Sequence, residues 1–443
     1  MRGSDDSAVR DVPTAQELRA VLRRHVVDAW FPRAIDTEHG GFLCDFDRRW
    51  RPRGRQVKLL EFQARTTRFA AAASRVFPED ASLRAVALHG LRCLSEVMWD
   101  AKDGGWFHRL DRKGRPLEAG TKHTHGAAYA IEAFVLVHEA TGDPGALDLA
   151  RRGFDWIDAV AHDARDGGWF GLVDRSGTPI LDAAHCPWPA AYDSIGTYFG
   201  MKDLNVHSDL LESLVHLRRV LDAPRVEERL AEIVDVVFRR LHDPATGGLH
   251  YFVSRDWVPL PRSHRAGNEV QSVARAWLVR DRLGDRALPI ARGIVTHALA
   301  HGLDPATGGI FAAGIDAPPE VLSDMGPLGA RAKPTWVQFE ALKAFLAMRL
   351  LEPHDPRWLA HFASQWRHLL RWHVDAAHGG TYEGGLDTAP RWRRRAVLAP
   401  RAITRKASPW KDGSHDASTL IFCLEHVEAA RAAAGAPPPL AVR

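Results

Sequence analysis

The sequence predicts an all-α protein folded as an (α/α)6 barrel, a closed toroid of six helical hairpins joined by short β-like loops. Three observations support this prediction: a turn motif that recurs six times, helical spacing of apolar residues between its copies, and a repeat length that accommodates two helices. The chain has 443 residues, of which 45% are hydrophobic, and it exceeds the roughly 100–200 residues of an ordinary domain. It must form two domains or one large closed architecture, and the repeat favours the second.

The recurring motif is an aspartate followed, four residues on, by two glycines. The first glycine falls at positions 40, 104, 167, 247, 308 and 379, so the intervals are 64, 63, 80, 61 and 71 residues. Aspartate caps its own backbone, and glycine supplies the positive φ that a tight turn needs before a short extended segment. We therefore interpret the motifs as architectural turns. They begin at Asp36, Asp100, Asp163, Asp243, Asp304 and Asp375.

Between the turns, apolar residues recur every three or four positions, which is typical of helices. The spacing is clearest over 58–77, 125–142 and 204–221. A unit of about 60–70 residues holds two ordinary helices and their connections. Six units fill the chain, so we expect one barrel over residues 14–430, an N-terminal extension at 1–13 and a Pro- and Ala-rich tail at 431–443. The inner helices of such a ring surround a central cavity.

Composition excludes several classes of function. The chain has 59 Lys+Arg against 55 Asp+Glu, a formal net charge of only +4, whereas a nucleic-acid or anionic-membrane surface needs a concentrated basic stripe. The one dense basic run, 391–395, is either a solvated loop or an anion or subunit contact. Its four cysteines are far apart, which argues against disulfides and cysteine metal sites. With no membrane span and no signal peptide in view, we expect a cytoplasmic protein.

Four segments carry a resemblance to a known family. They are 58–65 (KLLEFQAR), 202–213 (KDLNVHSDLLES), 333–346 (KPTWVQFEALKAFL) and 410–415 (WKDGSH). In this order they resemble the N-acylglucosamine 2-epimerase superfamily, which includes cellobiose 2-epimerases and mannose or sulfoquinovose isomerases. The resemblance implies metal-free proton abstraction at C2 of an open-chain sugar, with His415 as a catalytic base. It also carries over Lys58, Arg65, Lys202, Asn205, Glu212, Trp336, Gln338, Glu340 and Lys411.

Three departures from the family pattern change the expected chemistry. The second base of the family lies in a G-H-x-x-E segment, where this chain has Asn268 for the histidine and Gln271 for the glutamate, and Ser418 replaces an arginine. Amide side chains donate and accept hydrogen bonds but do not exchange protons at neutral pH. Asn268 and Gln271 are therefore expected to bind the sugar, together with Arg65, Asn205, Trp336, Glu340 and Lys411.

The loss of one base has a stereochemical consequence. Epimerisation at C2 removes a proton from one face of a planar enediolate and delivers one to the other face, so it needs two bases. Aldose–ketose isomerisation moves a proton from C2 to C1 on one face and needs one. A chain that keeps His415 alone therefore favours isomerisation over epimerisation.

Other side chains are candidates for a substitute base or a sugar-binding platform. Glu269, between Asn268 and Gln271, points about 100° away from its neighbour on a helix, and we predict it as the second catalytic residue. Tryptophans stack on sugar faces or pack between helices; the candidates are Trp106, Trp169, Trp188, Trp257, Trp336 and Trp410. Catalytic and structural interpretations both stay open for His123, His125, His207, Asp209, Glu212 and His264.

The leading hypothesis is a metal-free sugar isomerase or epimerase with no cofactor, a small-molecule sugar as its only partner, and a monomeric or homodimeric state. A glycoside hydrolase or polysaccharide lyase on the same barrel is the alternative. Hydrolysis needs two carboxyl groups that face one cavity, about 6.5–9.5 Å apart for inversion. The pool for such a pair is Asp209, Glu212, Glu269 and Glu340. A carbohydrate-binding protein without catalysis is the third hypothesis.

Overall fold

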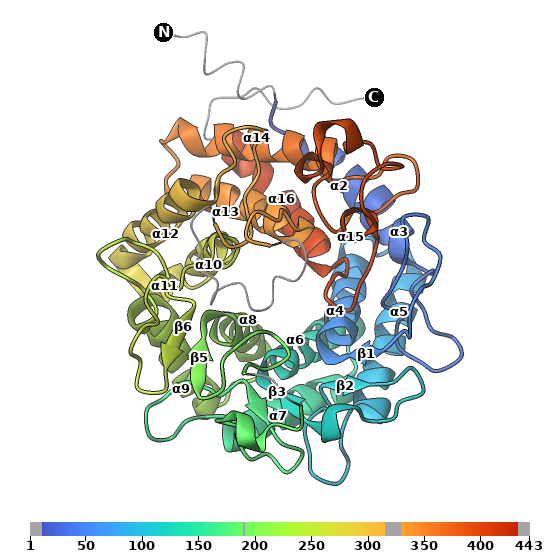
Figure 1. The fold of residues 1–443 in the computed structure, drawn as a ribbon, viewed down its shortest axis with the longest axis vertical. Helices are drawn as coiled ribbons and strands as arrows, with labels where there is room; N and C mark the ends of the chain where they lie inside the picture. Colours follow the sequence, from blue (N-terminus) through green and yellow to red (C-terminus); the bar gives the residue numbers. More distant parts are fainter. Residues whose placement is uncertain (1–10, 189–190, 315–328, 433–443) are drawn as a thin grey trace.

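The computed structural model describes residues 11–188, 191–314 and 329–432, and in this part of the chain two concentric rings of helices surround a central axis (Figure 1). Neighbouring inner helices pack against each other, and the last packs against the first, so the ring is closed. The inner ring consists of α4 (Leu60–Val76), α6 (Thr124–Thr141), α8 (Leu204–Val220), α10 (Ala266–Leu278), α13 (Thr335–Leu351) and α16 (Ser414–Ala432).

The outer ring covers the inner ring helix by helix. Helix α16, near the end of the chain, packs on α2, near its beginning, and this contact completes the sixth hairpin. The outer helices, in the order of their inner partners from α4 to α16, are α5 (Ala81–Arg92), α7 (Pro144–Val160), α9 (Pro224–Asp235), α12 (Ala287–Gly302), α14 (Pro356–Trp372) and α2 (Ala15–Val21). The predicted (α/α)6 barrel is confirmed.

Short segments connect these helices. Three are α3 (Asp28–Trp30), α11 (Arg280–Leu283) and α15 (Arg401–Thr404). The π-helical segments are Leu22–Val27, Cys93–Val97 and Val236–Arg240. The 3-10 turns are Glu118–Gly120, Ala183–His185, Gly284–Arg286, Leu386–Thr388 and Arg391–Arg393.

All six Asp-to-Gly-Gly motifs form the same turn, as predicted. In each copy the aspartate amide donates to the carbonyl of the second glycine at 2.8–3.0 Å. The aspartate side chain also accepts from amides inside the turn, as Asp36 does from Glu38 and His39. Gly40 and Gly41 have φ of 71° and 67°, a region that only glycine adopts without strain.

Three two-stranded ladders join the segments after three of the six turns, which begin at Asp100, Asp163 and Asp243, to the starts of the inner helices α4, α6 and α8. They are β1 (Lys58–Leu59) with β2 (Arg109–Leu110), β3 (Lys122–His123) with β4 (Leu172–Val173), and β5 (Met201–Asp203) with β6 (Phe252–Ser254), all antiparallel. The buried Lys58 and Lys202 occupy equivalent positions and donate to the carbonyls of Gly40 and Gly167, both at 2.5 Å. These two lysines, which the resemblance singled out, therefore hold turns and do not face the cavity.

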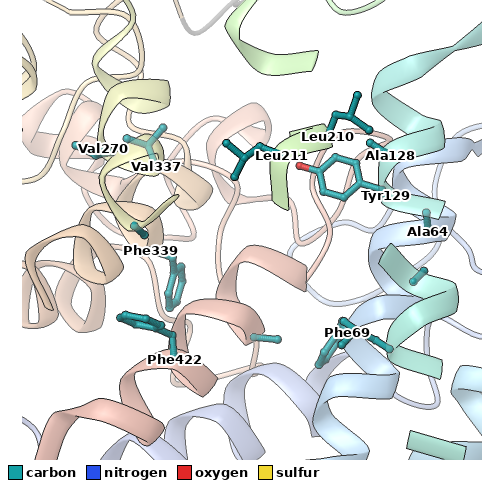
Figure 2. Close-up of a cluster of buried hydrophobic side chains, with 14 of the residues drawn as sticks. Ala64, Phe69, Ala128, Tyr129, Leu210, Leu211, Val270, Val337, Phe339 and Phe422 are labelled. Atoms are coloured by element: carbon teal, nitrogen blue, oxygen red, sulfur yellow. The ribbon is translucent and has the colours of Figure 1, made fainter. Parts of the chain in front are cut away.

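The hydrophobic core lies between the inner helices and behind them. Figure 2 shows side chains from all six inner helices, among them Phe69 of α4, Leu211 of α8, Phe339 of α13 and Phe422 of α16. Helix α6 is buried at every position from 124 to 137, because it is covered by neighbours on both sides and by α7. The outer helices keep one polar face, and two of them begin with a proline after an aspartate cap, at Asp143 and Asp355.

Several further expectations can be compared with the structure. The four cysteines are free, and the basic run is largely exposed to solvent. No helix in the described ranges is long and apolar enough to cross a bilayer. The predicted extension at 1–13 and tail at 431–443 lie almost wholly outside the described residues.

Candidate active site

A cavity of about 290 Å³ opens at the N-terminal ends of the inner helices. Five inner helices each contribute a residue of their first turn to its wall: His125, Asn205, Asn268, Trp336 and His415. Helix N-termini carry partial positive charge. The cavity thus combines polar side chains with a field that favours a developing negative charge.

His415 has the geometry of a general base. Its Nδ1 lies 2.7 Å from Oε1 of Glu340, and a carboxylate can only accept, so Nδ1 carries a proton and neutral His415 keeps its lone pair on Nε2. Burial opposes the charge of Glu340, but Lys343 and the bond to His415 outweigh burial and lower the pKa of this carboxyl. The ring of Trp336 packs against the imidazole of His415, with 5.7 Å between the ring centroids. Within the described chain, Nε2 makes no hydrogen bond.

His125 also lines the cavity, but two carboxylates hold it. Its Nδ1 lies 3.1 Å from Glu61 and its Nε2 lies 2.8 Å from Asp209. Burial lowers the pKa of His125, but the bonds to Asp209 and Glu61 outweigh burial and raise it to about 9. His125 is an imidazolium at pH 7 and cannot accept a proton. Of the two interpretations left open for His125, this buried pairing with two carboxylates favours the structural one.

Amide and guanidinium groups provide hydrogen bonds around these histidines. Nδ2 of Asn268 donates to Oδ1 of Asn205 at 3.0 Å, which links α10 to α8. Oε1 of Gln271 and Nε of Arg65 are buried and have no hydrogen-bond partner in the described part of the chain. Arg65 lies 4.2 Å above the ring of Tyr129. The structure therefore brings His415 together with five residues that were predicted to bind the sugar: Arg65, Asn205, Asn268, Gln271 and Trp336.

Glu269 does not line the cavity, so its prediction as a base needs correction. Its carboxylate accepts from the amide of Leu249 at 3.0 Å and lies 2.9 Å from Nδ1 of His297 on α12. Leu249 follows a glycine turn, and Gln63, His207 and Gln338 make the same contact with Phe42, Trp169 and Ile310 after three other turns. Glu269 is the fourth member of this set of turn clamps, a structural role that the repeat itself imposes.

Two other predicted residues lie behind the wall. Lys411 donates to the Thr381 hydroxyl and the Asp412 carbonyl, at 2.9 and 3.1 Å, and is not among the lining residues. Glu340 contacts the cavity only through His415. Neither residue lines the cavity, so we correct both predictions of sugar binding: Glu340 positions His415, and Lys411 holds the loop of Thr381.

The remaining acidic and histidine candidates are held in the barrel wall or outside it. Asp209 pairs with His125 and Arg275, and Glu212 faces a second pocket at the opposite end of the inner helices. His123 accepts from its own helix and contacts Asp193 at 2.9 Å. His264 lies outside the cavity, beside Glu269.

Four of the six tryptophan candidates do not line the cavity. Trp106 and Trp169 are fully buried, and Trp257 donates to the carbonyl of Asp166 at 2.7 Å. Trp188 is half-buried and does not line the cavity. Only Trp336 and Trp410 line it.

Sequence reasoning missed several lining residues. They come from separate loops or from the second helical turn, where no motif marked them: Tyr129, Tyr192, Asp193, Tyr251, Arg265 and Glu383. Of these residues, Tyr129 alone had a signal in the sequence, since it follows His125 by one helical turn.

Four groups of His, Asp and Glu in the described ranges are close enough to share a cation, and none of them is formed by cavity-lining residues.

Fold and cavity together define a class: an (α/α)6 barrel with its candidate site at the first turns of the inner helices. Residues 105–192 match the family model of N-acylglucosamine 2-epimerase (GlcNAc 2-epimerase). The chain is 24% identical to a cellobiose 2-epimerase of Bacteroides fragilis over 92% of this chain and 98% of the relative.

Two solved structures share the fold. A cellobiose 2-epimerase from Bacillus thermoamylovorans superposes with a TM-score of 0.77 at 20% identity, over 93% of this chain and 98% of the other. A D-mannose isomerase superposes with a TM-score of 0.75 at 17% identity, over 94% of this chain and 98% of the other. The family match and the full-length relative make the chain similar to N-acylglucosamine 2-epimerases and cellobiose 2-epimerases, in line with the resemblance of its motifs.

Proposed function

We propose that this protein is an aldose–ketose isomerase that acts on an open-chain sugar and uses His415 as its single base. The observation that carries the proposal is the free Nε2 of His415, which faces a cavity where His125 is already charged and the other first-turn residues are amides or tryptophan. One base suffices for transfer between C2 and C1 on one face of the sugar.

The reaction proceeds in two proton transfers at carbon. Nε2 of His415 removes the proton from C2, the C–H electron pair forms a C1–C2 double bond, and O1 takes up the negative charge. The proton of the O2 hydroxyl then passes to O1, which leaves the negative charge on O2. The electron pair of the C1–C2 double bond takes the proton from Nε2 at C1, and an electron pair of O2 forms the C2 carbonyl. Arg65 and the helix N-termini stabilise the enediolate charge, so the proposed reaction needs no metal at the reacting carbons.

Other lining groups are suited to hold the sugar. The unpartnered acceptor of Gln271 and the carboxamide of Asn268 line the cavity, where they can hydrogen-bond to sugar hydroxyl groups. Trp336 offers an aromatic surface beside His415. The cavity volume of about 290 Å³ is at the small end of ligand sites, which range from about 300 to 1,000 Å³. We therefore propose a monosaccharide as substrate.

The test is to incubate the enzyme with a panel of aldoses, including mannose, glucose and cellobiose, in heavy water. We expect ketose from at least one monosaccharide, with deuterium incorporated at carbon and little C2 epimer. If no aldose of the panel gave ketose or took up deuterium, the proposal would be contradicted. A dominant C2 epimer would support a two-base epimerase instead.

The glycosidase alternative has less support. Of the four carboxylates from which an acid–base pair was expected, Glu212 faces the other end, Glu269 clamps a turn, and Asp209 and Glu340 are bonded to histidines. Release of reducing sugar from a panel of oligosaccharides would support the glycosidase alternative. Sugar binding in calorimetry with no turnover would favour the non-catalytic hypothesis.

A further inference from the structure

Three buried side chains outside the cavity converge at one point. His368 lies on α14, His373 follows that helix, and Asp387 lies in the 3-10 turn Leu386–Thr388. They are 5%, 0% and 4% exposed. One potential ligand atom from each lies within 4.8 Å of the other two.

The hydrogen bonds of the two histidines fix their protonation. Nδ1 of His368 lies 3.2 Å from the carbonyl oxygen of Thr307, which can only accept, so this nitrogen carries the proton. Nδ1 of His373 lies 3.0 Å from the hydroxyl of Thr335. That hydroxyl donates its own proton to the carbonyl of Tyr382, so it accepts from His373. Each neutral imidazole therefore keeps its lone pair on Nε2.

Asp387 is oriented in the same way. Its Oδ2 accepts from Nζ of Lys333 at 2.5 Å and from the hydroxyl of Thr307 at 2.6 Å. Its Oδ1 is buried and has no partner, and the same is true of both Nε2 atoms, among the described residues. Three acceptor atoms thus face one another without a donor, an arrangement that is costly unless a cation or a donor such as water lies between them.

The local charge also leaves room for a cation. Lys333 contacts Asp304 at 2.6 Å as well as Asp387, so two carboxylates share one ammonium group. The sum is one excess negative charge in a buried setting, which a bound cation would offset.

Gly385 provides an independent observation. Its φ is −69°, a conformation open to any residue, so the backbone does not require glycine. A Cβ at this position would lie 2.3 Å from Oδ1 of Asp387 and 3.0 Å from Nε2 of His373. The missing side chain keeps the space between the ligand atoms open.

We propose that His368, His373 and Asp387 bind a divalent transition-metal ion of the Zn²⁺ class. Two imidazoles and one carboxylate are ligands that zinc prefers, and each imidazole donates its other N–H to an oxygen, as metal-bound histidines do. The ion would hold α14 to the loop after it, which contains Asp387. Through the hydrogen bonds of Asp387 to Lys333 and Thr307, it would also stabilise the loop before α13. It lies outside the cavity, and we assign it a stabilising role that is independent of the proposed isomerase.

The test uses the full chain purified without added metal, then stripped with EDTA and titrated with Zn²⁺ and Co²⁺. We expect about one equivalent of Zn²⁺ per chain, a visible Co²⁺ spectrum of histidine ligation, and a higher melting temperature with Zn²⁺. His368→Asn keeps a donor for Thr307 but removes the ligand, and Gly385→Ala fills the space. Each should weaken Zn²⁺ binding by about 100-fold or more.

His250→Asn is the matched control, because His250 belongs to a different His/Asp group with Asp243 and His264. It should bind Zn²⁺ like the wild type. Stripped wild-type protein that neither binds Zn²⁺ nor gains thermal stability would overturn the proposal, as would a loss of binding in His250→Asn with full binding in His368→Asn. The wild-type titrations decide the matter even if a variant fails to fold.

Discussion

His125 and His415 occupy equivalent places in the barrel, yet their surroundings give them different chemistry. Each is the second residue of an inner helix, and each bonds through Nδ1 to a glutamate of a neighbouring inner helix, Glu61 or Glu340. They differ at Nε2, which contacts Asp209 in His125 and faces the cavity in His415. A second carboxylate turns one histidine into a fixed cation, and its absence leaves the other available for the role of base that we propose.

The largest expected effect is on catalysis by His415. His415→Asn should lower kcat/KM for the isomerised aldose by about 10²–10⁴-fold, because a general base contributes that much, while the melting temperature stays close to that of the wild type. The control is His426→Asn on the same helix, which faces the opposite pocket and should keep full activity. Equal activities of the two variants would refute the comparison.

The corresponding change at His125 should act on stability. His125→Asn leaves Glu61 and Asp209 buried without their shared cation, and breaking a buried ion pair costs about 3–5 kcal/mol. Urea unfolding of both proteins at pH 7 measures this loss. A change below about 1 kcal/mol, the range of exposed pairs, would mean that the two carboxylates do not depend on His125.

The pH dependence of stability sharpens the same contrast. The folded pKa of His125, about 9, is above its unfolded value of about 6.5. The contribution of His125 to the free energy of unfolding is therefore fully present below pH 6.5. It is lost as the pH rises through 9, and the loss is at most about 3 kcal/mol. Unfolding free energies from pH 6 to 10 should fall in the wild type and fall less in His125→Asn. Parallel curves would contradict the assignment of the charge to His125.

A smaller effect is expected when the support of His415 is removed. Glu340→Gln keeps an acceptor for Nδ1 but no longer stabilises the imidazolium that forms during turnover, so kcat should fall on the order of 10–100-fold. KM should change little, because Glu340 does not line the cavity. Steady-state kinetics measures kcat and KM separately. A large rise in KM with unchanged kcat would assign Glu340 to sugar binding.

The fold and the place of His415 in the cavity wall were predictable, because both depend on local patterns. The glycine turns recur in the sequence, and the segments around Trp336 and His415 match family motifs. The role of Glu269 was not predicted, since it depends on Leu249 and on His297 of a different helix. An alignment of the repeats would have placed Glu269 with Gln63, His207 and Gln338, and so would have revealed the turn clamp.

Loop residues were the least predictable part of the site. Asp193, Arg265 and Glu383 meet at the cavity from three distant loops, and only the closed ring brings those loops together. The position of Lys411 was missed for the same reason, because its partner Thr381 belongs to another loop.

The most direct test of the single-base account follows a deuterium atom placed at C2 of the aldose substrate. Wild-type enzyme should form ketose that retains part of the deuterium at C1, because Nε2 of His415 carries the atom from C2 to C1 on one face, and it should form little C2 epimer. Complete loss of the label together with a C2 epimer that appears as fast as the ketose would require a second base and would contradict the account.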